Sequence, residues 1–315
     1  MSARLRGLAQ ETEQIVAAGR YRAPDGREVL LAEDIEAARA GTRMFGPGPV
    51  EVPQFAPAAG FAPADTIFEV TGESSLEAAR RLGEAGPGTG RRPGESRPEA
   101  VRPSGEASAG RPVGRPTGGV AVLNFASARN PGGGFLNGAQ AQEEALCRAS
   151  ALYTCLLRAR EFYDHHRAHR DPFYTDRVVH SPAVPVFRDD RGRLLDSVHL
   201  VGFLTAAAPN AGVVRRTAPE RVAELPRALA VRAEQVLSVA VALGYRRLVL
   251  GAWGCGVFQN DPAQVAGAFR TLLAPGGRFA GAFEHVVFGV LDRTPGAVAR
   301  AAFVQAFAEQ QPARS

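Results

Sequence analysis

The chain contains no lysine, so all 37 of its Lys and Arg residues are arginine. With 32 acidic residues, the formal net charge is +5. Because alanine, glycine and proline are also abundant, we attribute this basic balance to compositional bias rather than to a surface that binds nucleic acid. The absence of lysine excludes the phosphate-binding motif GxxxxGK[ST], and the dinucleotide-binding motif GxGxxG is missing as well.

Cysteine is also scarce, and long apolar runs are absent. Cys147, Cys155 and Cys255 form neither a CxxC pair nor a cluster with the spacing of metal ligands. This disfavours a disulfide framework and a zinc site, and it fits a reducing compartment. No apolar leader or run long enough to span a bilayer is visible. We therefore expect a cytoplasmic protein without a membrane segment.

The first 60 residues are predicted to contain two helices. Ser2 can cap a helix whose apolar residues recur at helical spacing, and a second helix is expected to end at Gly41. Residues 84–118 are Gly, Pro, Arg, Glu and Ser with almost no large apolar side chain, which predicts a flexible insertion. The expected organisation is a helical N-terminal segment at 1–60 and a larger domain at 61–315 that this insertion interrupts.

The rest of the chain alternates apolar strands with helices. Strands are expected at 65–70, 120–126, 177–187, 198–207, 246–253 and 285–292. Helices are expected at 74–82 with Ser74 as its cap, at 141–160, at 219–243, after Asp261, and from Pro295 onward. Near-continuous apolar strands separated by helices indicate an α/β fold, with a mixed or mostly parallel sheet covered on both faces.

Two glycine-rich loops each follow a predicted strand. The first contains Gly132, Gly133 and Gly134, and the second is the stretch GCGVF at 254–258. Backbone N–H groups in such loops can approach an anion closely, and the next helix adds a favourable dipole. One glycine triplet is equally typical of a tight turn, but two loops could hold a diphosphate from both sides. Phe258 then either packs in the core or offers a flat face to a base or ribose.

Gln142, Glu143 and Glu144 stand in the first turn of the helix after the first loop. Carboxylates are favoured there by the helix dipole alone, which is the simplest interpretation. The pair also lies close enough in sequence to face a ligand in the loop. Since neighbours on a helix diverge by about 100°, two adjacent glutamates suit different tasks better than the opposed arrangement of a retaining glycosidase. One could protonate a leaving oxygen while the other holds a sugar hydroxyl.

The stretch GGGFLNGAQAQEE at 132–144 resembles the GGG-x(6–8)-QEE signature of poly(ADP-ribose) glycohydrolases. Other segments, among them GAWGCGVFQNDP around the second loop, are similar to the microbial-type form of that family over most of the chain outside 84–118. The resemblance implies that residues 61–315 form a macrodomain-like catalytic domain, a three-layer α/β core with a mixed sheet between helices. It implies further that residues 1–60 are a helical accessory segment packed on this core. It also implies hydrolysis of the ribose–ribose O-glycosidic bonds of poly(ADP-ribose), without a metal or other cofactor.

Roles for individual residues follow from the same resemblance. Glu144 would be the general acid that later activates water, and Glu143 would hold ribose hydroxyls. Substrate contacts are implied for Gly132, Gly133, Gly134, Gln142, Gly254, Cys255, Gly256, Val257 and Phe258. The expected partner is poly(ADP-ribose) or an ADP-ribosylated macromolecule, bound by a monomer, without recognition of a nucleic-acid sequence.

Other hypotheses stay open at this point. His165 and His169 have the i, i+4 spacing of metal ligands but lack the HExxH motif, and Cys255 could be a nucleophile but has no identifiable His–Asp set. The chain could also be a non-catalytic ADP-ribose reader, which would not need an acid at position 144. A hydrolase of ADP-ribosyl groups on protein or DNA would use the same acid on another substrate.

Overall fold

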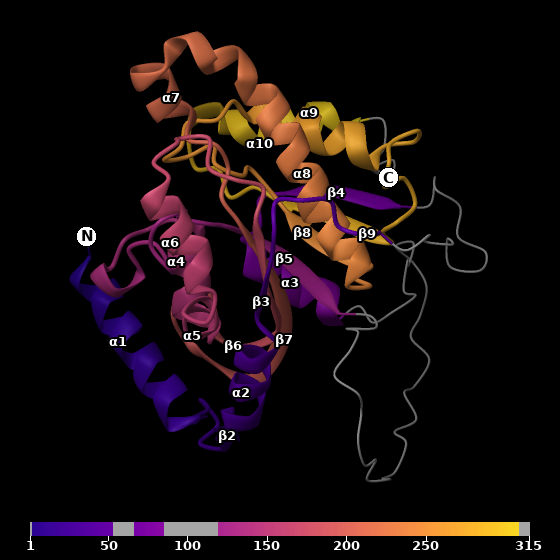
Figure 1. The fold of residues 1–315 in the computed structure, drawn as a ribbon. Helices are drawn as coiled ribbons and strands as arrows, with labels where there is room; N and C mark the ends of the chain where they lie inside the picture. The colour runs from indigo at the N-terminus through magenta and orange to yellow at the C-terminus, as the bar shows by residue number, and fades with distance from the viewer. Residues whose placement is uncertain (1, 53–65, 85–118, 309–315) are drawn as a thin grey trace, which may run out of the picture.

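The computed structural model describes residues 2–52, 66–84 and 119–308, and a seven-stranded mixed sheet runs through its centre (Figure 1). The strand order is β3-β6-β7-β5-β8-β9-β4. Neighbouring pairs from β7 to β4 are parallel, whereas β6 is antiparallel to both β7 and β3. The strands are β3 (Arg43–Phe45), β4 (Ile67–Thr71), β5 (Val120–Phe125), β6 (Val178–Arg188), β7 (Leu194–Ala206), β8 (Arg247–Leu250) and β9 (His285–Gly289). A separate hairpin is formed by β1 (Arg20–Arg22) and β2 (Glu28–Leu30).

Helices cover both faces of this sheet, because side chains alternate along its strands. In β5, Val120 and Val122 enter one core, while Ala121 and Leu123 enter the other. The first core is covered by α1 (Ala3–Ala18), α2 (Ala32–Gly41), α3 (Ser75–Glu84), α4 (Gln142–Ala149), α5 (Leu152–Leu156) and α6 (Arg160–Ala168). The second is covered by α8 (Leu225–Ala242), α9 (Pro262–Leu273) and α10 (Val298–Ala306), the orange to yellow helices of Figure 1. The expected three-layer α/β fold is confirmed.

The caps predicted from sequence form as expected. Ser2 accepts from the N–H of Leu5, and Asp261 accepts from two N–H groups at the start of α9. Ser74 Oγ accepts from the N–H of Glu77 at 3.1 Å, and the Glu77 carboxylate accepts from the N–H of Ser74 at 3.1 Å. This reciprocal capping box fixes the start of α3. The second predicted helix, α2, ends at Gly41.

The prediction of a single helix at 141–160 is wrong. The α4 helix ends at Ala149, and Ser150 leaves helical geometry to form an isolated bridge with Val186 of β6. The Ser150 hydroxyl donates to Leu146 O at 2.7 Å and accepts from the N–H of Leu152 at 3.2 Å. Because apolar side chains continue to be buried in α5, the sequence periodicity does not show this break. Cys147 and Cys155, expected on one helix, therefore lie on α4 and α5, where both are buried.

Other element boundaries differ less. The stretch 219–243 begins as a 3₁₀ segment, η3 (Pro219–Glu224), before α8, and η4 (Pro295–Ala297) precedes α10. The helix α7 (Ala211–Thr217), capped by Asn210, was not expected from the sequence. The insertion predicted at about 84–118 lies outside the described residues beyond Glu84, and so does the predicted domain boundary near residue 60. Among the helices of the described ranges, none has the length and apolar character to cross a membrane.

The N-terminal helix is joined to the helix of the two glutamates by a buried polar contact. Thr12 is fully buried, and its hydroxyl donates to Arg148 O of α4 at 2.7 Å. The same oxygen accepts from Arg188 Nε at 3.3 Å. Arg188 also lies 2.9 Å from Glu11, so its buried charge is paired. The α1 helix thus packs against α4 through a buried hydroxyl, carbonyl and guanidinium that depend on one another for hydrogen bonds.

We expect Thr12→Val to destabilise the protein by about 1–3 kcal/mol, because valine fills the space but leaves the Arg148 carbonyl and the Arg188 guanidinium short of a partner. Urea unfolding would measure the change. The matched control is Thr271→Val, whose hydroxyl donates to Gly267 O on the exposed side of α9. That variant should change stability by no more than about 0.5 kcal/mol. Equal losses in the two variants would contradict the role given to the buried contact.

Candidate active site

A cavity of about 880 Å³ opens at the carboxyl ends of β5 and β8, between the two glycine-rich loops. This is the edge at which open α/β sheets bind ligands. The cavity is lined by nine of the residues selected from the sequence: Gly133, Gly134, Gln142, Glu143, Glu144, Gly254, Gly256, Val257 and Phe258. Gly132 and Cys255 are the two selected residues that do not line it. Segments more than a hundred residues apart in the sequence therefore share one site.

The conformation of the first loop favours glycine at position 133. Its φ is +56°, and a Cβ at this position would overlap the carboxylate of Glu144. The neighbouring Gly134 N–H donates to Glu144 Oε1 at 2.9 Å. Gly132, in the same loop, has a φ of +64°, and a Cβ there would come within 2.9 Å of Tyr153 Cδ2. The loop therefore lies close to α4, and one of its N–H groups holds one carboxylate oxygen of Glu144.

The second loop is held from below by a buried asparagine. Asn260 Nδ2 donates to Pro209 O at 2.8 Å and to Gly254 O at 3.2 Å. Gly254 has a φ of +71°, and a Cβ there would come within 2.6 Å of Ala208 Cβ. The loop carries Val257, whose exposed fraction is 81%, and Phe258, which lines the cavity and packs against the second core. A rigid support therefore presents an apolar side chain at the mouth of the cavity.

Glu144 has one oxygen held and one oxygen without a protein partner. Its residue exposure is 8%, and Oε1 accepts from the first loop. Oε2 is buried and makes no hydrogen bond to any described residue. An unpaired buried carboxylate oxygen is costly, so it usually has a partner from outside the chain. Since Glu144 lines the cavity, that partner can be a ligand or water.

Glu143 is almost fully buried, and protein groups hold both of its carboxylate oxygens. Its exposed fraction is 2%; Oε2 accepts from the N–H of Ser127 at 2.7 Å, and Oε1 accepts from Asn124 Nδ2 at 3.3 Å. Burial raises the pKa of Glu143 to about 8, against the opposing effect of the Ser127 hydrogen bond, and the charge of Glu144 raises it further. The two adjacent glutamates therefore occupy different environments, as their divergence on the helix predicts.

The side-chain amide of Gln142 makes its hydrogen bonds to the sheet and to α3. Its Oε1 accepts from the N–H of Phe125 at 2.9 Å. Its Nε2 donates to Leu123 O at 2.8 Å and to Ser75 Oγ at 3.1 Å. These contacts join the start of α4 to β5 and α3. The substrate contact implied for Gln142 stays a prediction, because the structure places its amide in an anchoring role.

The remaining candidates have structural partners. Burial raises the pKa of Cys255 to about 12, so this thiol stays protonated at neutral pH, which favours packing over nucleophilic attack. The rings of His165 and His169 stack with centroids 4.1 Å apart, while His166 Nε2 contacts Thr175 Oγ1 at 2.9 Å. Within the described ranges, no three His, Cys, Asp or Glu side chains come together as metal ligands would.

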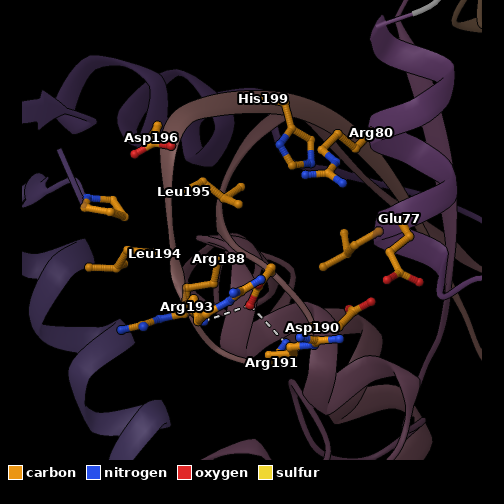
Figure 2. A pocket seen from close by; sticks show the side chains of 13 residues that line it. Glu77, Arg80, Arg188, Asp190, Arg191, Arg193, Leu194, Leu195, Asp196 and His199 are labelled. Atoms are coloured by element: carbon orange, nitrogen blue, oxygen red, sulfur yellow. Dashed lines mark hydrogen bonds and ion pairs between the residues drawn. The ribbon is translucent and has the colours of Figure 1, made fainter.

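A second cavity, of about 540 Å³, lies beside α3 and the turn between β6 and β7 (Figure 2). Its side chains carry charges of both signs. Arg193 Nε lies 2.7 Å from Asp189, and Arg188 lies 2.9 Å from Glu11. Because these cations already have carboxylate partners, we place the candidate active site in the first cavity.

Sequence reasoning missed three residues of the site. Tyr153 lines the cavity and follows the unexpected break at Ser150. Asn124 lies inside β5, and Ser127 follows that strand. A polar residue within an otherwise apolar strand is the signal that could have identified Asn124.

The chain is similar to a known protein family and to several solved structures. A family model described as the microbial-type PARG catalytic domain matches residues 9–189. The poly(ADP-ribose) glycohydrolase of Thermomonospora curvata is 45% identical with a TM-score of 0.79, and the match covers 97% of this chain and 100% of that one. Its structure bound to the inhibitor ADP-HPD gives the same values. The Deinococcus radiodurans enzyme in complex with ADP-ribose is 42% identical with a TM-score of 0.68, over 87% of this chain and 97% of that one. The search of curated proteins found no match. The family model covers more than half of the chain and the solved structures cover most of it, so the chain belongs to the microbial-type poly(ADP-ribose) glycohydrolases.

Proposed function

We propose that this chain hydrolyses the ribose–ribose O-glycosidic bonds of poly(ADP-ribose), with Glu144 as its general acid and base. The observation that carries the proposal is the buried, unpartnered Oε2 of Glu144 at the cavity between the two glycine loops. The solved relatives support the ligand, since one holds ADP-ribose and another the inhibitor ADP-HPD.

The two loops would hold the diphosphate of ADP-ribose from both sides, with Phe258 near the adenosine end. Glu144 Oε2 would donate a proton to the bridging oxygen as the bond to the ribose C1″ breaks. The resulting oxocarbenium-like centre is stabilised by the adjacent diphosphate charge. Water then adds to C1″ and returns a proton to Glu144, which restores the acid for the next cycle.

Glu143 would accept hydrogen bonds from ribose hydroxyls, an interaction that fixes the sugar beside Glu144. A carboxylate held by Ser127 and Asn124 keeps one orientation, and fixed positioning of the reacting groups contributes much of an enzyme's rate. We propose that the chain acts on this polymer as a monomer, through interactions with ADP-ribose rather than through nucleic-acid sequence.

The direct test is incubation of the purified chain with poly(ADP-ribosyl)ated protein, followed by chromatographic detection of free ADP-ribose. We expect release of ADP-ribose and shortening of the polymer. Binding of ADP-ribose in calorimetry without any release would instead identify a reader. Release from a mono-ADP-ribosylated protein or DNA, with the polymer left intact, would support the alternative hydrolase.

A further inference from the structure

Glu143 is supported by a buried polar chain that crosses two strands of the sheet. Asn124 is fully buried in β5, and its Nδ2 donates to Glu143 Oε1 at 3.3 Å and to Thr205 Oγ1 of β7 at 3.1 Å. Thr205 is fully buried too. Neither Asn124 nor Thr205 lines the cavity, and of the two only Asn124 contacts the glutamate.

The orientation of the Asn124 amide has a chemical reason. Turning the amide by 180° would place Oδ1, an acceptor, against the carboxylate of Glu143, where two acceptors repel. With Nδ2 toward Glu143, the amide donates to Oε1 of the carboxyl group, while Oδ1 is left without a partner among the described residues. An unsatisfied buried oxygen is a cost that an asparagine with only a packing role would not need to carry.

We propose that Asn124 is a positioning residue for Glu143, which it holds in one orientation through a hydrogen bond that favours the ionised over the protonated carboxyl. The consequence for catalysis rests on the proposed function, in which Glu143 accepts hydrogen bonds from ribose. Asparagine suits this role because it donates without a charge of its own, and so it introduces no competing ion pair beneath the site.

Few other groups near Glu143 can affect its charge. Glu144 and Cys147 lie on the same helix, and Tyr163 faces it from α6. Burial raises the pKa values of Cys147 and Tyr163 well above their ordinary range, so both stay neutral at working pH. Glu144 raises the pKa of Glu143. The hydrogen bonds from Asn124 and Ser127 oppose this effect and the effect of burial.

The test is a carbon-13 NMR titration of the full chain labelled at the Glu carboxyls, with the Glu143 signal assigned by its loss in Glu143→Gln. Asn124→Leu, which matches the volume, and the smaller Asn124→Ala both remove the donor. We expect each to raise the titration midpoint of Glu143 by about one pH unit or more. The matched control is Thr205→Val, which removes the other partner of the same amide and should leave this midpoint unmoved.

The pH dependence of kcat/KM for ADP-ribose release supplies the second readout. Because a raised pKa keeps Glu143 protonated to higher pH, the acid limb in the Asn124 variants should move upward, and their release should recover as pH rises. Equal midpoints in Asn124→Leu and Thr205→Val would overturn the proposal. If the wild type released no ADP-ribose but the Glu143 midpoint moved as expected in the Asn124 variants, the proposed function would be overturned. The positioning role of Asn124 would remain intact.

Discussion

Glu144→Gln is expected to reduce ADP-ribose release by about a thousandfold or more while leaving ADP-ribose affinity nearly unchanged. The amide oxygen of glutamine can still accept from the Gly134 N–H, so the loop and the shape of the cavity are kept. An amide cannot donate and take back a proton at the bridging oxygen, and general acid–base catalysis contributes roughly 10²–10⁴ in rate for each group. Release from automodified protein and calorimetry with ADP-ribose would measure the two quantities separately.

The control for this substitution is Glu161→Gln, on the exposed side of α6 and outside the cavity lining. It removes the same charge from the chain without touching the site, so turnover should match the wild type. Turnover retained by Glu144→Gln would refute the assignment of the acid. Loss of ADP-ribose binding together with turnover would instead show that Glu144 serves in binding the ligand.

Gly133→Ala is expected to lower kcat/KM by about a hundredfold. The added methyl group would overlap the Glu144 carboxylate and come within 3.2 Å of Glu143 Oε2, so at least one carboxylate must move. Displacement of a reacting group by about 1 Å can cost this much in rate. The φ of +56° adds a conformational cost of about 1–2 kcal/mol for any residue with a Cβ. Steady-state kinetics and thermal unfolding would measure both effects.

Gly267→Ala provides the comparison for the same change of residue. Gly267 lies inside α9 with nothing within 4 Å of the added Cβ. Alanine in a helix interior stabilises by about 0.5–1 kcal/mol relative to glycine, so this variant should unfold at a slightly higher temperature with unchanged kinetics. If Gly133→Ala behaved like Gly267→Ala, the close approach of the first loop to Glu144 would not matter for turnover.

Much of this architecture is predictable because its signals are local. Near-continuous apolar runs predict β5, β8 and β9, and the caps at Ser2, Ser74 and Asp261 locate three helix starts. The glycines of the first loop are followed by the two glutamates at the start of the next helix. Because a loop at a strand end lies close to the start of the helix that follows it, this pattern indicates the cavity. The family signature then gives roles to residues that geometry alone leaves open.

The features that were missed depend on contacts between distant segments. Ser150 leaves the helix because it pairs with Val186, and nothing in the local apolar pattern shows that partner. Asn124 and Thr205 are 81 positions apart in sequence and meet only through pairing of β5 with β7. Gln142 could be chosen as a ligand contact from its place in the motif, but only the sheet shows that its amide is already engaged.

The division of the interior into two cores has a consequence for how the protein responds to its ligand. Phe135, directly after the glycines of the first loop, belongs to the core under α4, whereas Phe258 of the second loop packs against the core under α9. A molecule held by both loops joins two packing units that lie on opposite faces of the sheet. Its binding free energy therefore couples the local unfolding of the two layers, so that an opening of either one must first release the ligand.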